Sequence, residues 1–329
     1  MTPLSYSLPA FRPGDYAAAE ARLQDLKSLG FRWVTFTPTY LVHDEVPLRI
    51  DVVRGPGAVE LRAAVDAAHG LGLQVQLNPH LDFETTLTGG PYDWRRRMYF
   101  SPKEAYLDEV LLPLADMLPD ALTLGSELDV SLVAFAEDWA EVRKQVPVRI
   151  AGHKLNGDSL QRRSESIREA LNTEKARRGE EPVGWWAYRR RVSEIGRYLS
   201  TLEFTSFSFY PAYAGSMDSF TKSAAEKKEQ LIDVAGEHPC FAIGEFGLGS
   251  SDLTRPWYFD ASTFSTAEAL ASRRQYYLDF LQALTAEPEL FGPHPASFWT
   301  VGHFDFLEGP FRDDELRSAV SRYNVTLST

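Results

Sequence analysis

Two stretches of the chain each end an apolar run in a glutamate. Residues 239–250 run through a buried-type segment to Glu245, and residues 121–129 do the same to Glu127. Short apolar runs bounded by Gly or Pro are typical of buried parallel strands. Two carboxylates delivered to strand ends can act on one substrate as a proton donor and a nucleophile. The sequence therefore predicts a carboxylate pair, and the other elements must position it.

The rest of the chain alternates strands with helices. Eight strands are expected, at about 4–8, 31–36, 73–77, 148–152, 204–209 and 296–300 besides the two runs that carry the glutamates. Such alternation is typical of a (β/α)8 TIM barrel, an α/β fold. We predict one barrel over residues 1–329, with a helical excursion at about 156–184 after strand five. A doubly wound sheet is the alternative, but the chain lacks a Gly-rich phosphate turn after an early strand.

Composition excludes several classes of partner. The 329 residues are 44% hydrophobic and 24% charged, as in a globular protein, and the formal net charge is -12. This charge argues against binding to nucleic acid or to an anionic membrane, so a neutral or weakly charged substrate is expected. Cys240 is the single cysteine, which excludes an internal disulfide and a cysteine zinc site. The N-terminal residues show no signal peptide, so a cytoplasmic location is expected unless a leader was trimmed.

In a barrel, the carboxyl ends of all strands meet at one rim, where such folds carry their active sites. Substrate-binding candidates at the predicted strand ends are Tyr40, Asn78, His80, Ser126, His153, Tyr210 and Trp299, with His303 and Asp305 beyond the last strand.

Several of these residues also have a plain structural interpretation. Glu245 could form a salt bridge across the barrel, Asp129 could replace Glu127 as the reactive carboxylate, and Tyr213 competes with Tyr210. Trp94 lies in a loop that could form a substrate wall or an ordinary turn.

Strands four and seven face each other across a barrel, so their two carboxylates can flank one substrate. Carboxyl groups about 5 Å apart allow one to attack a sugar carbon while the other protonates the leaving oxygen. That arrangement performs retaining glycoside hydrolysis. It requires different surroundings for the two groups, because the acid needs a raised pKa and the nucleophile must stay ionised.

The segment Gly125-Ser126-Glu127-Leu128 closely resembles the strand-four motif of the family 113 β-mannanases, which are clan A glycoside hydrolases. Residues 77–82 are similar to their strand-three end, and the likeness extends from strand one to strand eight. The resemblance implies that Glu127 is the acid/base and Glu245 the nucleophile. It also implies that Tyr210 hydrogen-bonds the nucleophile and that Trp299 forms a platform under the sugar.

The chain departs from this pattern at two places. Most of the clan has Asn before the acid/base, where this chain has Ser126, and many members keep an Arg at the end of strand two that is missing here. The predicted function is a retaining glycoside hydrolase acting without a cofactor on a neutral β-linked oligo- or polysaccharide, with mannan as the first expectation. The alternatives are a non-catalytic carbohydrate-binding barrel and a metal-dependent barrel hydrolase, although the seven histidines are scattered.

Overall fold

The protein folds into a closed parallel barrel, as the alternation of strands and helices predicts. The computed structural model describes residues 1–43, 49–83, 98–156, 165–237, 240–256, 260–300 and 304–327. The barrel closes because β1 pairs in parallel with both its sequence neighbour β2 and the last strand β10. In order around the barrel the strands are β1 (Leu4–Ala10), β2 (Trp33–His43), β4 (Gln74–Leu77), β6 (Ala121–Ser126), β7 (Ala151–Leu155), β8 (Phe204–Phe209), β9 (Cys240–Phe246) and β10 (Ala296–Phe298).

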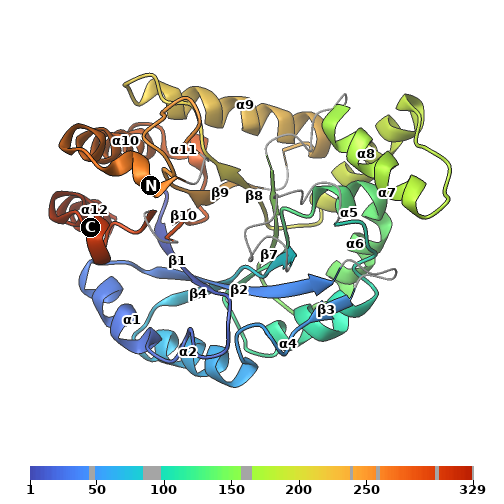
Figure 1. Ribbon diagram of the computed structural model, residues 1–329, viewed down its shortest axis with the longest axis horizontal. Helices are drawn as coiled ribbons and strands as arrows, with labels where there is room; N and C mark the ends of the chain where they lie inside the picture. The colour runs from blue at the N-terminus through green and yellow to red at the C-terminus, as the bar shows by residue number, and fades with distance from the viewer. Residues whose placement is uncertain are drawn as a thin grey trace.

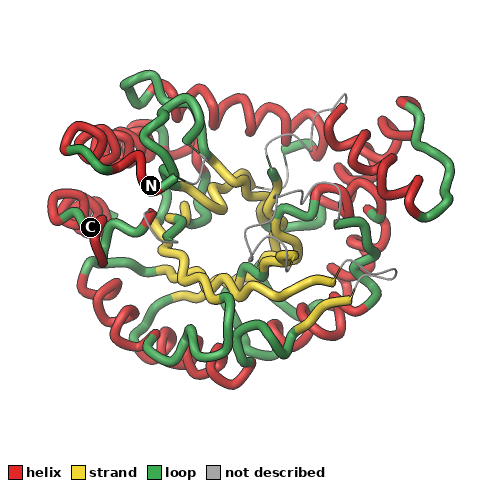
Figure 2. The backbone as a smooth tube through the Cα atoms, in the orientation of Figure 1, coloured by secondary structure: helices red, strands yellow, loops and turns green. Residues whose placement is uncertain are grey.

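The helices form an outer layer around the strands (Figures 1 and 2). Both chain termini lie on the same side of the molecule, so the last helix closes the ring beside the first strand (Figure 1). The helices are α1 (Ala19–Ser28), α2 (Ala58–Gly70), α4 (Leu112–Ala115), α5 (Asp129–Ala134), α6 (Ala136–Gln145), α7 (Glu165–Arg177), α8 (Trp185–Leu199), α9 (Asp218–Ala235), α10 (Ala267–Ala286), α11 (Pro288–Phe291) and α12 (Asp314–Thr326), with a π-helical turn at Leu107–Leu111 and 3-10 turns at Ala261–Phe264 and Gly309–Phe311.

Strand β2 is longer than the sequence predicts. The sequence predicts that this strand ends between Thr37 and Tyr40, but it continues to His43 and there pairs with two short strands, β3 (Arg49–Asp51) and β5 (His80–Phe83). The parallel β2–β5 pairing begins with Thr39 opposite His80. This extension lengthens the barrel at its carboxyl-terminal rim and fixes residues 80–83 there as a strand.

The barrel lumen changes from apolar to polar along its length. Trp33, Ala121 and Phe204, which begin their strands, form an apolar cluster with Ala242. Gly152 makes room for it, since a Cβ there would lie 2.2 Å from the Phe204 ring. Above this cluster the lumen contains hydroxyl and amide pairs, namely Ser5–Thr35 at 2.7 Å, Ser7–Ser297 at 3.0 Å and Gln76–Thr123 at 3.0 Å. The polar half faces the carboxyl ends of the strands.

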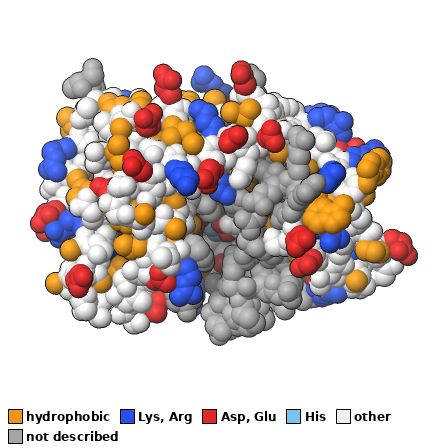
Figure 3. Space-filling view, turned by 90° about the horizontal axis from the view of Figure 1, so that it is seen from above, with side chains coloured by type: hydrophobic (Ala, Val, Ile, Leu, Met, Phe, Trp, Pro, Cys, Tyr) orange, Lys and Arg blue, Asp and Glu red, His pale blue; other side chains and the backbone are white. Residues whose placement is uncertain are grey.

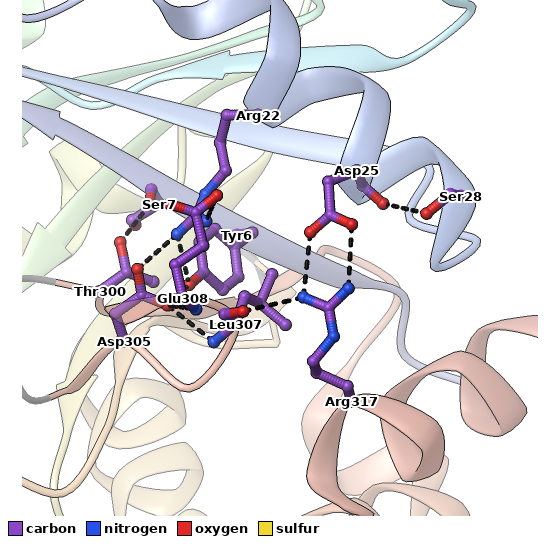
Figure 4. Close-up of polar contacts among 10 residues, drawn as sticks. All are labelled: Tyr6, Ser7, Arg22, Asp25, Ser28, Thr300, Asp305, Leu307, Glu308 and Arg317. Carbon is purple, nitrogen blue, oxygen red and sulfur yellow. Dashed lines mark hydrogen bonds and ion pairs between the residues drawn. The ribbon is translucent and has the colours of Figure 1, made fainter. Parts of the chain in front are cut away.

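An ion-pair network ties the end of the chain to its beginning (Figure 4). Asp305 accepts hydrogen bonds from Tyr6 of β1 and from Arg22 of α1, and Arg22 also contacts Glu308. Arg317 of α12 forms a bidentate pair with Asp25 of α1, at 2.9 and 3.1 Å. Asp305 therefore links the last part of the chain to β1 and α1, and the prediction that it lies at the rim of the site is wrong.

The interval predicted as a helical excursion contains the extra helix α7 between β7 and α8 (Figure 1). Its residues 157–164 lie outside the described residues. Within the described part of the chain, no helix combines the length and the apolar character needed to cross a membrane.

Candidate active site

A β-bulge turns Glu245 into the barrel. Strand β9 pairs with β8 so that Phe207 faces Ile243 and Ser208 faces Glu245, which leaves Gly244 as an extra residue. Side chains alternate along a strand, and Ala242 lies in the lumen, so an unbulged strand would point Glu245 outward. The bulge reverses this alternation: Glu245 faces the lumen, and Phe246 packs outward on Phe280 of α10.

A second bulge precedes Glu127. On β6, Thr123 pairs with Gly152 and Ser126 with Lys154, so β6 uses three steps where β7 uses two. Glu127 follows in a left-handed conformation, with φ of 58°, and its N–H donates to the Lys154 carbonyl at 2.8 Å. A non-glycine residue in this region stores backbone strain, which folded proteins keep where the surroundings fix it, often at functional sites. Both glutamates are therefore placed by local departures from regular strands.

Glu245 is held by a cation and a phenol. Lys154 Nζ lies 2.5 Å from one carboxylate oxygen of Glu245, and the Tyr210 hydroxyl donates to the other. The Lys154 side chain is 1% exposed and that of Glu245 is 10% exposed, so water screens this ion pair little. Burial and the nearby Glu245 carboxylate raise the pKa of Tyr210 well above its ordinary value, so its hydroxyl stays a donor.

His80 stands on the other side of Lys154. Its Nε2 lies 2.9 Å from Lys154 Nζ, and its ring stacks on Trp299 at 5.5 Å between centroids with 13° between planes. Burial and the charge of Lys154 lower the His80 pKa well below its usual value. His80 is therefore neutral, and because an ammonium only donates, His80 Nε2 accepts its hydrogen bond. The 4.0 Å approach of His80 to Glu245 is thus no ion pair.

Glu127 has surroundings of the opposite kind. Its carboxylate accepts a hydrogen bond from Ser208, and its pKa is raised, chiefly by burial and further by the charge of Glu245. Lys154 and the hydrogen bonds from Ser208 and Asn156 act in the other direction without cancelling the rise. Ser208 is in register with Glu245 on the neighbouring strand and donates to Glu127, so the two glutamates belong to one site. The surroundings of Glu127 favour a protonated carboxyl group, whereas Glu245 is paired with a cation.

A third carboxyl group, Asp82 of β5, faces the same site. Burial and the charges of Glu127 and Glu245 raise its pKa to about 7. It alternates along β5 with Leu81 and Phe83, which belong to the hydrophobic core, and so shares the inner face with His80.

Sequence reasoning missed Lys154, Ser208 and Asp82. The fifth strand was expected to end at His153, but it spans Ala151–Leu155, and the later boundary makes Lys154 the inward-facing residue. His153 points outward instead, fully buried between Trp139 and Tyr198, whose hydroxyl lies 3.1 Å from its Nδ1. The prediction that His153 binds substrate is wrong, because burial away from the rim leaves it a packing role and lowers its pKa to about 3.

Tyr40 is a second correction. On β2 it is in register with Leu81, not with His80, and like Leu81 it belongs to the hydrophobic core. Its ring lies against Gly55, where an added Cβ would approach it to 2.8 Å. Tyr40 therefore packs in the hydrophobic core, and the prediction that it binds substrate is wrong.

The two competing residues have structural contacts. The Tyr213 hydroxyl donates to Asp279 of α10. Asp129 accepts a hydrogen bond from the backbone N–H of Asn156 at 3.2 Å, just after β7. Trp94 and His303 lie outside the described residues.

Ser126 Oγ and Asn78 Oδ1, from two of the predicted ligand-binding residues, are among the buried polar atoms with no hydrogen-bond partner in the described part of the chain. Buried polar atoms are usually satisfied, so unpaired ones beside a carboxylate pair are available to a polar ligand. Asn78 Nδ2 itself lies 3.4 Å from His80 Nε2. Ser126 is registered with Lys154 on the next strand. Both predicted ligand-binding residues therefore lie with Glu127, Glu245, His80, Tyr210 and Trp299 in one cluster.

Metal binding finds no support in the part of the chain that is described, where no group of three or more His, Cys, Asp or Glu side chains is arranged to hold an ion.

On the face shown in Figure 3, acidic and basic side chains are interspersed.

Comparisons with known proteins agree on the fold. No family profile and no curated protein matches the sequence. Solved structures do match over nearly the whole chain. A family 113 β-1,4-mannanase superposes with a TM-score of 0.63 at 14% identity, covering 98% of both chains. The family 113 β-mannanase of Alicyclobacillus acidocaldarius gives 0.61 at 16%, covering 98% of this chain and 97% of the other. The endo-1,4-β-mannanase of Rhizomucor miehei gives 0.57 at 13%, covering 98% and 94%.

The chain therefore has the (β/α)8 barrel fold that these glycoside hydrolases share. The resemblance to the family 113 β-mannanases, predicted from two short motifs, is confirmed as a likeness of fold over the whole barrel.

Proposed function

We propose that the protein is a retaining β-glycosidase that cleaves a neutral β-linked oligo- or polysaccharide. The observation that carries this proposal is the contrast between two neighbouring glutamates. Glu245 is paired with Lys154 and Tyr210, whereas burial raises the pKa of Glu127. Retaining hydrolysis needs one ionised and one protonated carboxyl group on opposite sides of the scissile bond.

In the first half-reaction, Glu245 attacks the anomeric carbon and Glu127 gives its proton to the departing glycosidic oxygen. In the second, Glu127 takes a proton from water, which attacks the same carbon and releases the sugar from Glu245. Each step uses groups of this chain and water, so the proposal requires no cofactor.

The substrate class rests on likeness and on the polar lining of the site. All three proteins named above are described as β-mannanases, two of them as β-1,4-mannanases. Trp299 offers an aromatic surface beside the carboxylates, although one of its neighbours is already the His80 ring. We propose a mannan-type oligosaccharide first, bound by Asn78, Ser126 and Trp299.

The test is hydrolysis of a panel of aryl β-glycosides and β-linked manno-, gluco- and galacto-oligosaccharides. Wild type should turn over at least one of them, and Glu127→Gln and Glu245→Gln should each lose turnover. Glu141→Gln, at an exposed position on α6, is the matched control and should keep wild-type rates. Sugar binding without turnover by wild type would instead support a carbohydrate-binding barrel and overturn the proposal.

A further inference from the structure

Lys154 is a buried cation that the proposed mechanism has not yet used. Its side chain is 1% exposed and lies in the barrel lumen, between Glu245 at 2.5 Å and His80 at 2.9 Å. The adjoining strand makes room for it, because a Cβ on Gly244 would lie 2.9 Å from Lys154 Cδ. The Trp299 ring centroid is 5.9 Å from its Nζ. The bulge that turns Glu245 inward thus also adjoins the lysine that neutralises it.

The other described groups around Glu245 do not share this role. Tyr210 is a neutral donor, His80 is neutral, and Glu127 and Asp82 are acids that repel a second negative charge. Among the described residues, Lys154 is therefore the cation that contacts the Glu245 carboxylate.

The charge of Glu245 changes during the proposed reaction. When its oxygen bonds to the anomeric carbon, the carboxylate becomes a neutral ester, whose oxygens accept a weaker hydrogen bond from Lys154 than the carboxylate does. When water then attacks that carbon, the bond to Glu245 breaks and its electron pair returns to the carboxylate. Lys154 therefore faces a neutral ester in the intermediate and a growing negative charge in the second transition state.

We propose that Lys154 is a positioning residue that accelerates release of the sugar from Glu245. An interaction stronger in a transition state than in the preceding ground state raises the rate of that step. The same reasoning makes Lys154 favour the free carboxylate in the first step, so it shifts the balance between the two half-reactions toward breakdown of the intermediate. This inference rests on the proposed retaining mechanism.

The experiment traps the intermediate and times its breakdown. Wild type, Lys154→Met, Lys154→Gln and Lys154→Arg are labelled with 2,4-dinitrophenyl 2-deoxy-2-fluoro-β-mannoside or the corresponding glucoside. Excess label is removed, and loss of the adduct mass and recovery of activity are followed in buffer. The half-life of the adduct should lengthen by on the order of 10- to 100-fold in the Met and Gln variants, the effect of one charge-assisted hydrogen bond. Lys154→Arg should stay within a few-fold of wild type.

Two neutral variants are used in case the Met variant folds poorly. The Gln side chain also removes the charge, but it can still form hydrogen bonds within the lumen. If Lys154 served only in packing, its neutral variants would form and lose the adduct more slowly by similar factors. The half-life of the adduct would then not lengthen more than its formation time. Unchanged half-lives in both neutral variants would overturn this inference alone. Failure of wild type to form any adduct or to turn over any substrate would instead overturn the proposed function.

Discussion

The ends of β6 and β9 carry the same side chain in opposite surroundings. Glu245, at the end of β9, meets an ammonium and a phenol and sits on a bulged but otherwise extended strand. Glu127, just past β6, meets mainly a serine hydroxyl and an amide and has a left-handed backbone. One site stabilises the ionised carboxylate, whereas burial at the other favours the protonated acid.

This difference shows that the roles of two identical residues are set by their neighbours. Neither glutamate differs from the other as a side chain, and both follow a β-bulge. What separates them is the Lys154 ammonium, which contacts the Glu245 carboxylate directly and acts on the Glu127 carboxylate only through space. Changing the neighbours should therefore weaken one role at a time.

The largest effect is expected from removing the proton donor. Glu127→Gln should slow cleavage of substrates with poor leaving groups by roughly 10²- to 10⁴-fold, the usual contribution of general acid catalysis. Formation of the intermediate from a dinitrophenyl glycoside should be far less affected, because that leaving group needs no proton. Burst kinetics with the two types of substrate measure this. Equal losses on both would argue against Glu127 as the acid.

Removing the phenol from the other carboxylate should have a smaller effect. Tyr210→Phe deletes the hydrogen bond to Glu245, and kcat should fall about 10- to 100-fold, as for one hydrogen bond to a charged group. Tyr213→Phe is the matched control, since its hydroxyl contacts Asp279 instead. That control should lose stability while kcat changes little. If the two variants lost kcat equally, the specific role of Tyr210 would be refuted.

Asp82→Asn tests how much the negative charge of Asp82 lowers the free energy of unfolding. The folded pKa of about 7 lies above the ordinary 3.8, so the folded state holds the proton more tightly, and stability falls as pH rises from about 4 to about 7. Asn does not ionise, so the variant should be more stable than wild type at pH 8, by at most about 4 kcal/mol, and similar to it near pH 4. Thermal unfolding at both pH values measures this. An equal difference at both would contradict the assignment, and Asp116→Asn, at an exposed position, serves as control.

The smallest effect is expected at Ser208. Its hydrogen bond stabilises the Glu127 carboxylate and lowers its pKa, so Ser208→Ala should raise that pKa. The alkaline limb of kcat/KM, where the acid loses its proton, should then move to higher pH by a fraction of a unit to about one unit. The control is Ser206→Ala on the same strand, whose hydroxyl has no hydrogen-bond partner among the residues that the structure describes, and this variant should leave the limb in place. A shift to lower pH in Ser208→Ala would contradict the account.

The sequence was sufficient for the barrel and for the two glutamates, because apolar runs ending in Glu127 and Glu245 mark buried strands and their carboxyl ends. It was insufficient where one residue of register decides which side a side chain faces. His153 and Lys154 are neighbours, and an expected strand of 148–152 instead of Ala151–Leu155 exchanges their apparent roles. Tyr40 failed for the same reason, since β2 runs past it and its alternation turns it into the core.

The contacts that separate acid from nucleophile were also beyond reach of pattern reasoning. Lys154 and Glu245 are 91 positions apart, and Ser208 and Glu127 are 81 apart. A lysine within the strand Ala151–Leu155, where most residues are apolar or small, was an available signal. The bulges themselves left only a glycine before each site, at Gly125 and Gly244.

The most direct test of the central claim is to map the residue that carries the covalent sugar. Wild-type protein trapped with the 2-fluoro glycoside would be digested, and the modified peptide sequenced by mass spectrometry. We expect the label on Glu245, in the peptide that ends β9, and none on Glu127 or Asp82. A label on either of those two carboxylates, or turnover that proceeds with no trapped species, would contradict the roles assigned to the two glutamates.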